Sequence, residues 1–507
     1  MNKILQTQFI SDAMSSLRSG KLSNPQIVLC HGVFDLVHPG HLQHLVQAKS
    51  FGNVLVVSIT ADKYVNKGPN RPYFNEDQRA SFLAALEIVD FVFVVNSDSA
   101  LPAIDAVKPD FYVKGPDYRN PKEDITGKID LERVNVELHG GKLVFTDGFT
   151  SSSTMLINNY LTPQDDKVRT WVKEYKEKFS LAETISWIDK LKEIEVNVLG
   201  ETIIDAYTEC KPLSKSSKDP ILAFHRFGTQ KFLGGVLAIA DSCSRWSKKT
   251  YVYSSCGHNF QELLDEIDVK IEFEQFHIRL SEDPTILKHR FVDVVSGNRV
   301  FEYYDFNPGM MQEKLQNDML DILGEKLKES NLLLLADYGH GFFGESMIKS
   351  ICDSNAFLAV NTQSNAGNRG FNTFSKYPRI DFLCLNGGEL ELELRKKDLD
   401  YLRVLPGIMK EKGCKNAIVT LGGEGLLTFD SLGESFLSPA LATKVVDKVG
   451  AGDSVLAIAS MLAFLSAPKE VIGLLASVVA AFEVAQLGHK KSLGIVGMKK
   501  YVNGLLG

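Results

Sequence analysis

The sequence predicts an α/β protein made of two domains, each built on a mainly parallel sheet. Between residues 26 and 159, short apolar runs alternate with helical patterns, which is the rhythm of βαβ units. The same rhythm returns on a larger scale from residue 195 onward. Most of the later apolar runs are followed by Gly, Asp or Asn, at the strand ends where α/β sheets bind their ligands.

In the first section, three apolar runs predict buried strands, at residues 27–30, 53–59 and 91–95. A Gly/Pro turn follows the first run, and a helix is expected from about His41. A stretch rich in Lys, Arg and Glu then predicts a charged helical connector. The expected organisation is an N-terminal extension at 1–25, a first domain at 26–160, the connector at 161–193 and a second domain at 194–507.

The second section predicts further strands at residues 196–199, 332–335, 357–360, 382–385 and 417–420. Its most apolar stretch is 471–487. Glu483 and Gln486 interrupt that stretch, which favours a buried helix over a membrane span. We therefore expect no membrane association.

The composition argues against several classes of function. The 507 residues carry a net charge of −7 and no long run of Lys or Arg, so a nucleic-acid partner is not expected. The seven cysteines form no Cys-x-x-Cys pair, which argues against a disulfide framework and a zinc site. The first residues soon turn polar and lack the apolar core of a signal peptide, so we expect a cytoplasmic location.

The segment from Gly32 to His41 has a pattern suited to binding a triphosphate. A strand ends at Gly32, and a helix is expected to begin near Pro39. His38 and His41 then lie beside a helix N-terminus, where the dipole and free N–H groups favour an anion. Nucleotidyl transfer depends on positioning and charge stabilisation, so this pattern predicts a nucleotidyltransferase with two catalytic histidines. The alternative is that the histidines only happen to flank a turn.

The same segment resembles the cytidylyltransferase-like superfamily, whose domains are Rossmann-like. Residues 71–79 and 113–118 are similar to segments of the bacterial heptose-1-phosphate adenylyltransferases, and the resemblance covers most of 26–160. It implies nucleotide or phosphate contacts for Gly32, Phe34, Lys67, Arg79, Ser152 and Thr154. It places Asp35 and Asp117 on the substrate side. The alternatives are a solvated Lys67, a helix-face ion pair of Arg79 and a helix N-cap at residues 151–154.

In the second section, Gly450, Ala451 and Gly452 precede Asp453 and an apolar helical run. Two glycines let the backbone N–H groups turn toward one point, which makes an anion hole at a helix start. Asp453 at its edge is placed to take a proton from a hydroxyl that attacks a γ-phosphate. The alternative is a tight turn before a core helix.

Two loops after predicted strands support phosphoryl transfer. One carries Thr420, Gly422 and Gly425; the other carries Asn386 and Glu389, which could hold a hydrated magnesium ion near phosphates. A capping Asn with a helix-dipole Glu is the alternative for that pair. In their order, these motifs resemble the ribokinase (PfkB) family of sugar kinases, and the resemblance implies a ribokinase-like α/β domain over 194–507.

The resemblance also implies a sugar side, with contacts from Asp205, Gly234, Gly235, Lys288 and Arg290. Here the chain departs from the family pattern at Glu201, Ala238, His340 and residues 361–363. Ala238 replaces an Asn, His340 replaces a Lys, and Asn-Thr-Gln replaces Asp-Pro-Lys. These departures favour an acceptor other than heptose 7-phosphate; the alternative is a kinase activity that has decayed.

Together, the two halves resemble the bifunctional heptose kinase/nucleotidyltransferase of lipopolysaccharide precursor synthesis, with the order of the domains reversed. The resemblance implies sugar phosphorylation by ATP and nucleotidyl transfer from ATP or CTP to a sugar 1-phosphate, both with Mg²⁺. It also implies a homodimer, with sugar phosphates and nucleoside triphosphates as small-molecule partners. Two alternatives are a cytidylyltransferase for glycerol phosphate or another polyol phosphate with a non-catalytic kinase domain, and a non-catalytic sensor.

Overall fold

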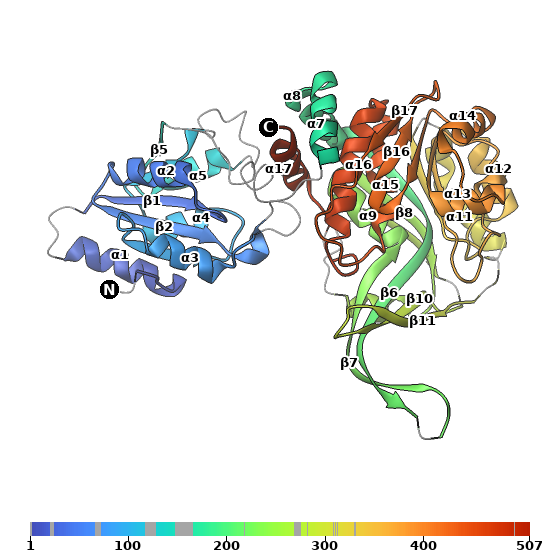
Figure 1. Ribbon diagram of the computed structural model, residues 1–507, viewed down its shortest axis with the longest axis horizontal. Helices are drawn as coiled ribbons and strands as arrows, with labels where there is room; N and C mark the ends of the chain where they lie inside the picture. The colour runs from blue at the N-terminus through green and yellow to red at the C-terminus, as the bar shows by residue number, and fades with distance from the viewer. Residues whose placement is uncertain are drawn as a thin grey trace. The chain divides into compact units, whose positions relative to one another are not determined.

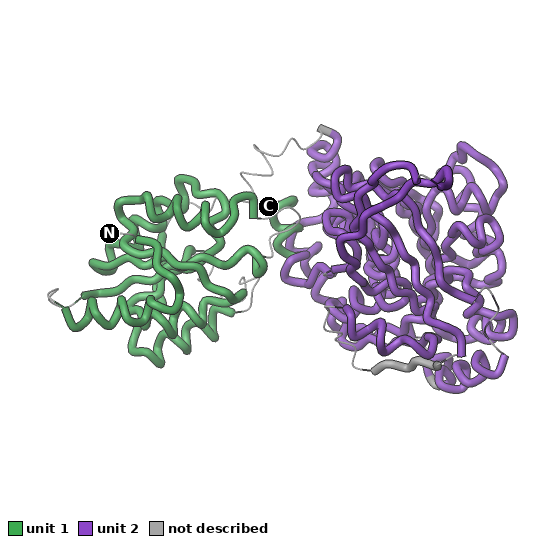
Figure 2. The backbone as a smooth tube through the Cα atoms, turned by 90° about the horizontal axis from the view of Figure 1, so that it is seen from below, with its two compact units in different colours: residues 1–165, 499–507 green, residues 166–498 purple. Residues whose placement is uncertain are grey.

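The protein is described by a computed structural model with two compact units (Figure 2). The N-terminal unit comprises residues 1–165 and 499–507, and the C-terminal unit comprises residues 166–498. The structure describes residues 3–20, 25–65, 72–116, 128–147, 166–216, 218–267, 275–280, 282–307, 309, 311, 313–328, 331–490 and 492–507.

The N-terminal unit is a five-stranded sheet covered by helices (Figure 1). Its strands are β1 (Ile27–Gly32), β2 (Val54–Thr60), β3 (Phe91–Val95), β4 (Phe111–Lys114) and β5 (Lys142–Phe145). Its helices are α1 (Ile10–Ser19), α2 (Pro39–Lys49), α3 (Glu76–Ala84), α4 (Leu101–Val107) and α5 (Ile129–Leu138). The strand order is β3-β2-β1-β4-β5 and every pairing is parallel, which confirms the predicted α/β class.

Alternating residues of β1 fill two cores, because successive strand side chains point to opposite faces. Ile27 and Leu29 pack with Ile10 of α1 and Ile104 of α4. Val28 and Cys30 belong to the other cluster, which includes residues from α2 and α3. β1 is therefore buried on both faces, and its carboxyl end is where a ligand loop is expected.

The C-terminal unit is built on a larger mixed sheet. Its strands are β6 (Glu195–Lys215), β7 (Leu222–Gly235), β8 (Lys249–Cys256), β9 (Gln275–Leu280), β10 (Ile286–Asp293), β11 (Arg299–Asp305), β12 (Leu332–Asp337), β13 (Phe357–Thr362), β14 (Phe382–Asn386), β15 (Asn416–Thr420), β16 (Leu426–Phe429) and β17 (Ser435–Ser438). The five predicted strands fall within β6, β12, β13, β14 and β15, and these five strands pair with one another in parallel.

The helices of this unit are α7 (Asp166–Lys178), α8 (Leu181–Lys190), α9 (Val236–Ser244), α10 (Phe260–Asp265), α11 (Glu313–Lys328), α12 (Glu345–Cys352), α13 (Gly387–Leu394), α14 (Tyr401–Lys412), α15 (Ala451–Phe464) and α16 (Lys469–Glu483). The last helix, α17 (Ile495–Leu506), begins in this unit, and its residues from Lys499 onward belong to the N-terminal unit. The apolar stretch predicted to be a buried helix is α16. α7 and α8 are the predicted charged helices, and Trp171 of α7 packs on Phe436 of the same unit. Among the described residues, no helix is both long and apolar enough to cross a membrane.

β6 serves two parts of the sheet. Its first residues pair with β8 and β12, and its later residues pair with β7 and β10. The hairpin of β6 and β7 extends beyond the layers of helices (Figure 1). The strand bridges the core and this extension, so residues near its middle, such as Asp205, lie where the two meet.

A buried polar cluster joins α9, α16 and the segment after α16. His489 places Nδ1 at 3.0 Å from Glu483 Oε1 and Nε2 at 3.1 Å from Asp241 Oδ2. Ser492 donates to the same oxygen of Asp241 at 2.5 Å. Burial alone lowers the pKa of His489, but the charges of Glu483 and Asp241 outweigh it and raise that pKa to about 10. The imidazolium therefore holds two buried carboxylates together.

The seven cysteines are all free and all buried. Burial raises the pKa of the Cys30 thiol to about 12. These side chains act as small apolar core residues.

Candidate active sites

The histidine pair of the N-terminal unit lies where β1 passes into α2. His38 is the N-cap of α2, and its Nδ1 accepts a hydrogen bond from the backbone N–H of Gly40 at 3.1 Å. The ring centroids of His38 and His41 lie 4.0 Å apart, and those of Phe34 and His41 lie 5.3 Å apart. The structure thus brings both imidazoles to one helix N-terminus, the position from which they could face a triphosphate.

Gly32 and Phe34 shape the loop between these elements. Phe34 has a positive φ of 49°, which is uncommon for a residue with a Cβ. A Cβ at Gly32 would lie 3.1 Å from the Phe34 ring. Both residues therefore act on the loop conformation; whether they also contact a nucleotide stays a prediction.

Arg79 requires a correction. We predicted that it holds phosphate, but its side chain is only 1% exposed. The guanidinium donates to the carbonyls of Phe74, Val33 and Thr60 at 2.6–3.0 Å and to Asp62 at 2.5 Å. The ion pair with Asp62 is a contact of the kind that the alternative, a helix-face ion pair, described, although the Arg79 side chain is buried. Arg79 ties α3 to the loops after β1 and β2.

Asp35 also has a structural contact. Its Oδ1 accepts from the backbone N–H groups of Tyr73 at 2.7 Å and Phe74 at 3.2 Å. The side chain is 1% exposed, so it anchors the segment before α3. Four other predicted residues lie outside the described residues: Lys67, Asp117, Ser152 and Thr154.

A polar group that we did not predict lies at the carboxyl end of the same sheet. Lys114 ends β4 and lies 3.1 Å from Glu132 of α5. His44, one turn after His41 in α2, lies 2.9 Å from Thr146. Burial, and then the charge of Lys114, lowers the pKa of His44 to about 4, so this imidazole is neutral at pH 7. The position of Lys114 at a strand end was the available signal.

In the C-terminal unit, the glycine turn leads directly into α15. Gly450 has a φ of +83° and is the N-cap, while Asp453 lies in the first turn. A Cβ at Gly450 would lie 3.1 Å from Glu483 Oε1. At Gly452 a Cβ would meet nothing within 4 Å, so that side of the turn is open. This is the arrangement of backbone N–H groups that binds phosphate.

Asp453 is held by two neutral donors. Its Oδ1 accepts from the Tyr338 hydroxyl at 3.0 Å and from Nε2 of Gln363 at 2.9 Å. Burial raises the pKa of Asp453 to about 7. A carboxylate with this pKa is suited to general-base catalysis near neutral pH.

The predicted sugar-side residues come together near Asp453. Asp205 forms an ion pair with Arg290. A Cβ at Gly234 would lie 2.6 Å from Asp205 Oδ2, so only glycine fits beside this carboxylate. Lys288 is 7% exposed and lies 5.5 Å from the ring of Tyr338, the residue that also contacts Asp453. Burial lowers the pKa of Lys288.

Glu201 organises the loop that supplies Tyr338, a role we did not predict. Its carboxylate accepts from the backbone N–H groups of Tyr338 and His340 at 3.0 Å and of Phe342 at 3.4 Å. Burial, and then the charge of Asp337, raises the pKa of Glu201 to about 7. The departure from the family's Asp at this position was the signal in the sequence.

The two loops predicted to bind the nucleotide begin at the carboxyl ends of β14 and β15. Asn386 and Glu389 form a capping box: Asn386 Oδ1 accepts from the Glu389 N–H at 2.8 Å, and Glu389 accepts from the Asn386 N–H at 2.9 Å. The structure therefore has the capping arrangement that was the alternative, and magnesium binding by Glu389 stays a prediction. Gly425 has a φ of +103°, so the loop after Thr420 requires glycine there.

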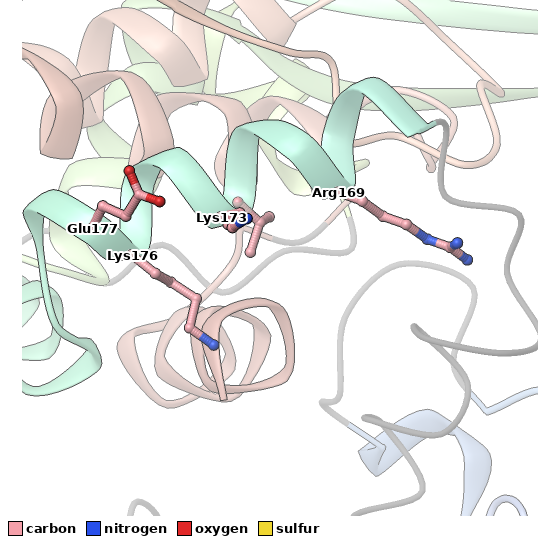
Figure 3. A pocket seen from close by; sticks show the side chains of 5 residues that line it. Arg169, Lys173, Lys176 and Glu177 are labelled. Carbon is pink, nitrogen blue, oxygen red and sulfur yellow. The ribbon is translucent and has the colours of Figure 1, made fainter.

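A shallow depression of about 380 Å³ lies on one face of α7 (Figure 3). It is lined by Arg169, Val172, Lys173, Lys176 and Glu177. None of the predicted site residues lines it. Among the described residues, no group of three or more His, Cys, Asp and Glu side chains could hold a metal ion.

Comparison with known families decides the class of the larger unit. Residues 194–493 match the pfkB family of carbohydrate kinases. The chain belongs to this family. Residues 29–159, ahead of the pfkB region, match the cytidylyltransferase-like family. The predicted combination of a Rossmann-like domain and a ribokinase-like domain is thereby confirmed.

Curated relatives of this pfkB-family chain carry the description "Bifunctional protein HldE". The chain is 35% identical to the protein of Trichlorobacter lovleyi over 171 residues, which are 33% of this chain and 32% of that protein. It is 41% identical to the Campylobacter fetus protein over 143 residues, 28% of each chain. The chain thus matches less than a third of the length of either relative. The crystal structure of phosphofructokinase-2 from Escherichia coli aligns with a TM-score of 0.49 and 16% identity, covering 62% of this chain and 99% of that chain.

Proposed function

We propose that the chain is a bifunctional enzyme of nucleotide-sugar synthesis. The pfkB unit phosphorylates a sugar or sugar phosphate with ATP. The N-terminal unit then transfers a nucleotidyl group from ATP or CTP to a sugar 1-phosphate and releases pyrophosphate. The observation that carries the proposal is that one chain joins a pfkB region, with Asp453 behind its glycine turn, to a cytidylyltransferase-like region with two histidines at a helix N-terminus.

In the kinase reaction, a sugar hydroxyl attacks the γ-phosphorus of ATP, and the bond to the β,γ-bridging oxygen breaks to leave ADP. Asp453 takes the hydroxyl proton as the new bond forms. The N–H groups of the turn at Gly450 stabilise the charge on the transferred phosphoryl group. Asp205 and Lys288 lie on the acceptor side and orient the sugar.

In the nucleotidyl transfer, an oxygen of the sugar 1-phosphate attacks the α-phosphorus of the nucleoside triphosphate, and pyrophosphate leaves. No side chain forms a covalent intermediate. His38 and His41 at the start of α2 bind the triphosphate and offset the charge that develops on it. Catalysis therefore rests on position and electrostatics.

Mg²⁺, when bound, neutralises phosphate charge in both reactions. In the kinase unit, Glu389 already accepts from the backbone N–H groups of Asn386 and Ser364. Burial also raises the pKa of Glu389 to about 7. These contacts suit an interaction through water better than direct coordination of the ion.

The test uses the purified 507-residue chain and two variants that control for each other. ATP is offered with heptose, hexose and polyol substrates and their phosphates, and phosphoryl transfer is measured separately from pyrophosphate release. Asp453→Asn is expected to abolish phosphoryl transfer and leave pyrophosphate release, whereas His41→Ala has the opposite effect. Phosphoryl transfer that survives Asp453→Asn overturns the kinase assignment. Light scattering tests the expected homodimer.

A further inference from the structure

The hydrogen bonds of Asp453 are concentrated on one oxygen. Tyr338 and Gln363 both donate to Oδ1, from the ends of β12 and β13. Among the described residues, none forms a hydrogen bond with Oδ2. Both donors are neutral, and Gln363 stands where the resembled sugar kinases have a lysine.

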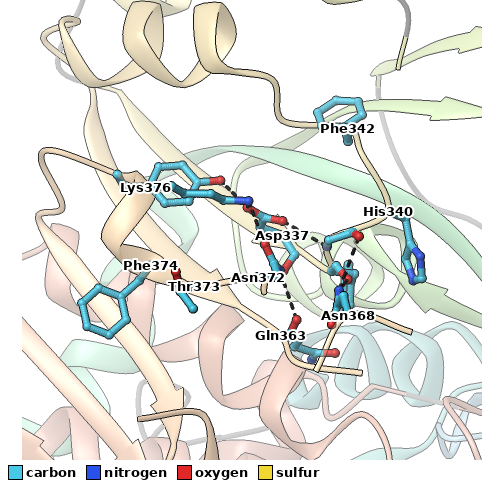
Figure 4. A network of polar contacts seen from close by, with 12 residues as sticks. Asp337, His340, Phe342, Gln363, Asn368, Asn372, Thr373, Phe374 and Lys376 are labelled. Carbon is cyan, nitrogen blue, oxygen red and sulfur yellow. Dashed lines mark hydrogen bonds and ion pairs between the residues drawn. The ribbon is translucent and has the colours of Figure 1, made fainter. Parts of the chain in front are cut away.

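An asparagine-rich loop after β13 holds these donors in place (Figure 4). Asn365 and Asn368 each donate from Nδ2 to the carbonyl of Tyr338 at 2.8 Å. Asn372 donates to the carbonyl of Gln363 at 3.1 Å and to that of Asp337 at 2.8 Å. Three side-chain amides of one loop therefore donate hydrogen bonds to backbone carbonyls at or beside the two donors.

Asp337 anchors the same network from the end of β12. Its carboxylate accepts from the Tyr377 hydroxyl at 2.6 Å and lies 2.5 Å from Nζ of Lys376. Its carbonyl accepts from the N–H of Gln363 at 2.8 Å. These hydrogen bonds fix the backbone at Tyr338 and Gln363, and with it the points from which the two donors reach Asp453.

We propose that Gln363 is a positioning residue for phosphoryl transfer: together with Tyr338 it fixes Oδ1 of Asp453 and leaves Oδ2 to take the proton of the acceptor hydroxyl. This inference rests on the proposed kinase function. A lysine at this place would lower the pKa of the base through its charge. The amide fixes the carboxylate without that charge, so the base titrates near neutral pH, in accord with the pKa of about 7 that burial gives Asp453.

Other charged or titratable groups also act on this carboxylate and must stay unchanged in the test. They come from β6, β10, α16, α13 and β14: Asp205, Lys288, Glu483, Glu389 and Cys384. Lys288 lowers the pKa of Asp453, whereas Asp205 and Glu483 raise it. Substitutions at Gln363 leave all five in place.

The experiment measures kcat for phosphoryl transfer from pH 5 to 9 in the 507-residue chain and in three variants substituted at Gln363. In the unmodified chain we expect kcat to fall as the pH drops below about 7, because the base must be ionised. Gln363→Leu removes the donor and should lower kcat about tenfold or more, with the KM for ATP little changed. Gln363→Lys should restore part of kcat and move the acidic limb down by about one pH unit or more. The nearly isosteric Gln363→Glu should move it up.

Tyr338→Phe gives a second measurement if a Gln363 variant does not fold. It removes the other donor at nearly constant volume, and we expect a lower kcat with the acidic limb moved to higher pH. Opposite shifts for Lys and Glu show that residue 363 acts on the base by its charge. The positioning role itself is tested by the loss of kcat in Gln363→Leu, with the KM for ATP unchanged. If the folded variants keep the original limb and a kcat within about twofold, the positioning role is wrong. If Asp453→Asn leaves phosphoryl transfer intact, the kinase assignment itself fails.

Discussion

Replacing His489 by alanine should strongly destabilise the C-terminal unit. The substitution leaves Glu483 and Asp241 buried without the imidazolium that bridges them. Breaking a buried ion pair by removing one partner costs about 3–5 kcal/mol. The raised pKa of His489 gives a similar upper limit for the loss of stability. A change from 6.5 to about 10 corresponds to about 5 kcal/mol, at about 1.36 kcal/mol per pH unit.

The tryptophans make this measurement specific. Trp171, Trp187 and Trp246 all belong to the C-terminal unit, so their fluorescence during urea unfolding reports that unit alone. Lys490→Ala is the matched control, because Lys490 is the exposed neighbour of His489. The control should change the free energy of unfolding by less than about 0.5 kcal/mol.

The pH dependence supplies a second test of the same reasoning. The pKa of His489 is raised in the folded state, so its contribution is fully present below about pH 6.5 and is lost as the pH rises through about 10. The unmodified chain should therefore lose more stability between pH 7 and 10 than His489→Ala does. A loss below about 1 kcal/mol for His489→Ala at pH 7, or identical pH curves, would refute the bridging role.

Three further substitutions test other contacts. Gly450→Ala forces a side chain into a positive φ beside Glu483 and should lower kinase kcat about tenfold or more while pyrophosphate release is unchanged. In Arg79→Lys the shorter side chain cannot reach the same carbonyls, so the N-terminal unit should lose about 3 kcal/mol of stability. The measurement is heat inactivation: nucleotidyl transfer should be lost at a lower temperature, whereas kinase activity should be unaffected. Glu201→Gln turns an amide NH₂ toward the N–H groups of residues 338–342; kinase kcat should fall, and an unchanged kcat would contradict the role of this carboxylate.

The central strands could be predicted because they are apolar runs buried on both faces. β12 is an example, since Leu332 to Leu335 are all fully buried. The long extension of β6 was not predicted. Its later residues are exposed and mixed in character, and they form a strand because they pair with β7 and β10. Such pairing is decided by contacts far apart in the sequence, which local patterns do not contain.

The same distinction explains the sites. His38 with His41, and Gly450 with Asp453, lie within a few residues of each other, so their spacing predicted their proximity. Gln363 is 90 residues from Asp453, and Tyr338 is 115 residues from it. Their contacts depend on the order of strands in the sheet. The prediction for Arg79 failed for the related reason that a charged residue in a helix gives no sign that it is buried.

Because the cysteines are buried, the rate at which their thiols are modified reports the opening of each unit separately. Cys30 is the one cysteine of the N-terminal unit, and the other six belong to the C-terminal unit. A thiol reagent modifies such a residue only after the surrounding structure has opened. The rate of modification at Cys30 therefore follows the opening of the strand that ends in the histidine loop. A mass spectrum would show which unit opened first, and whether a nucleotide slows one of them and not the other.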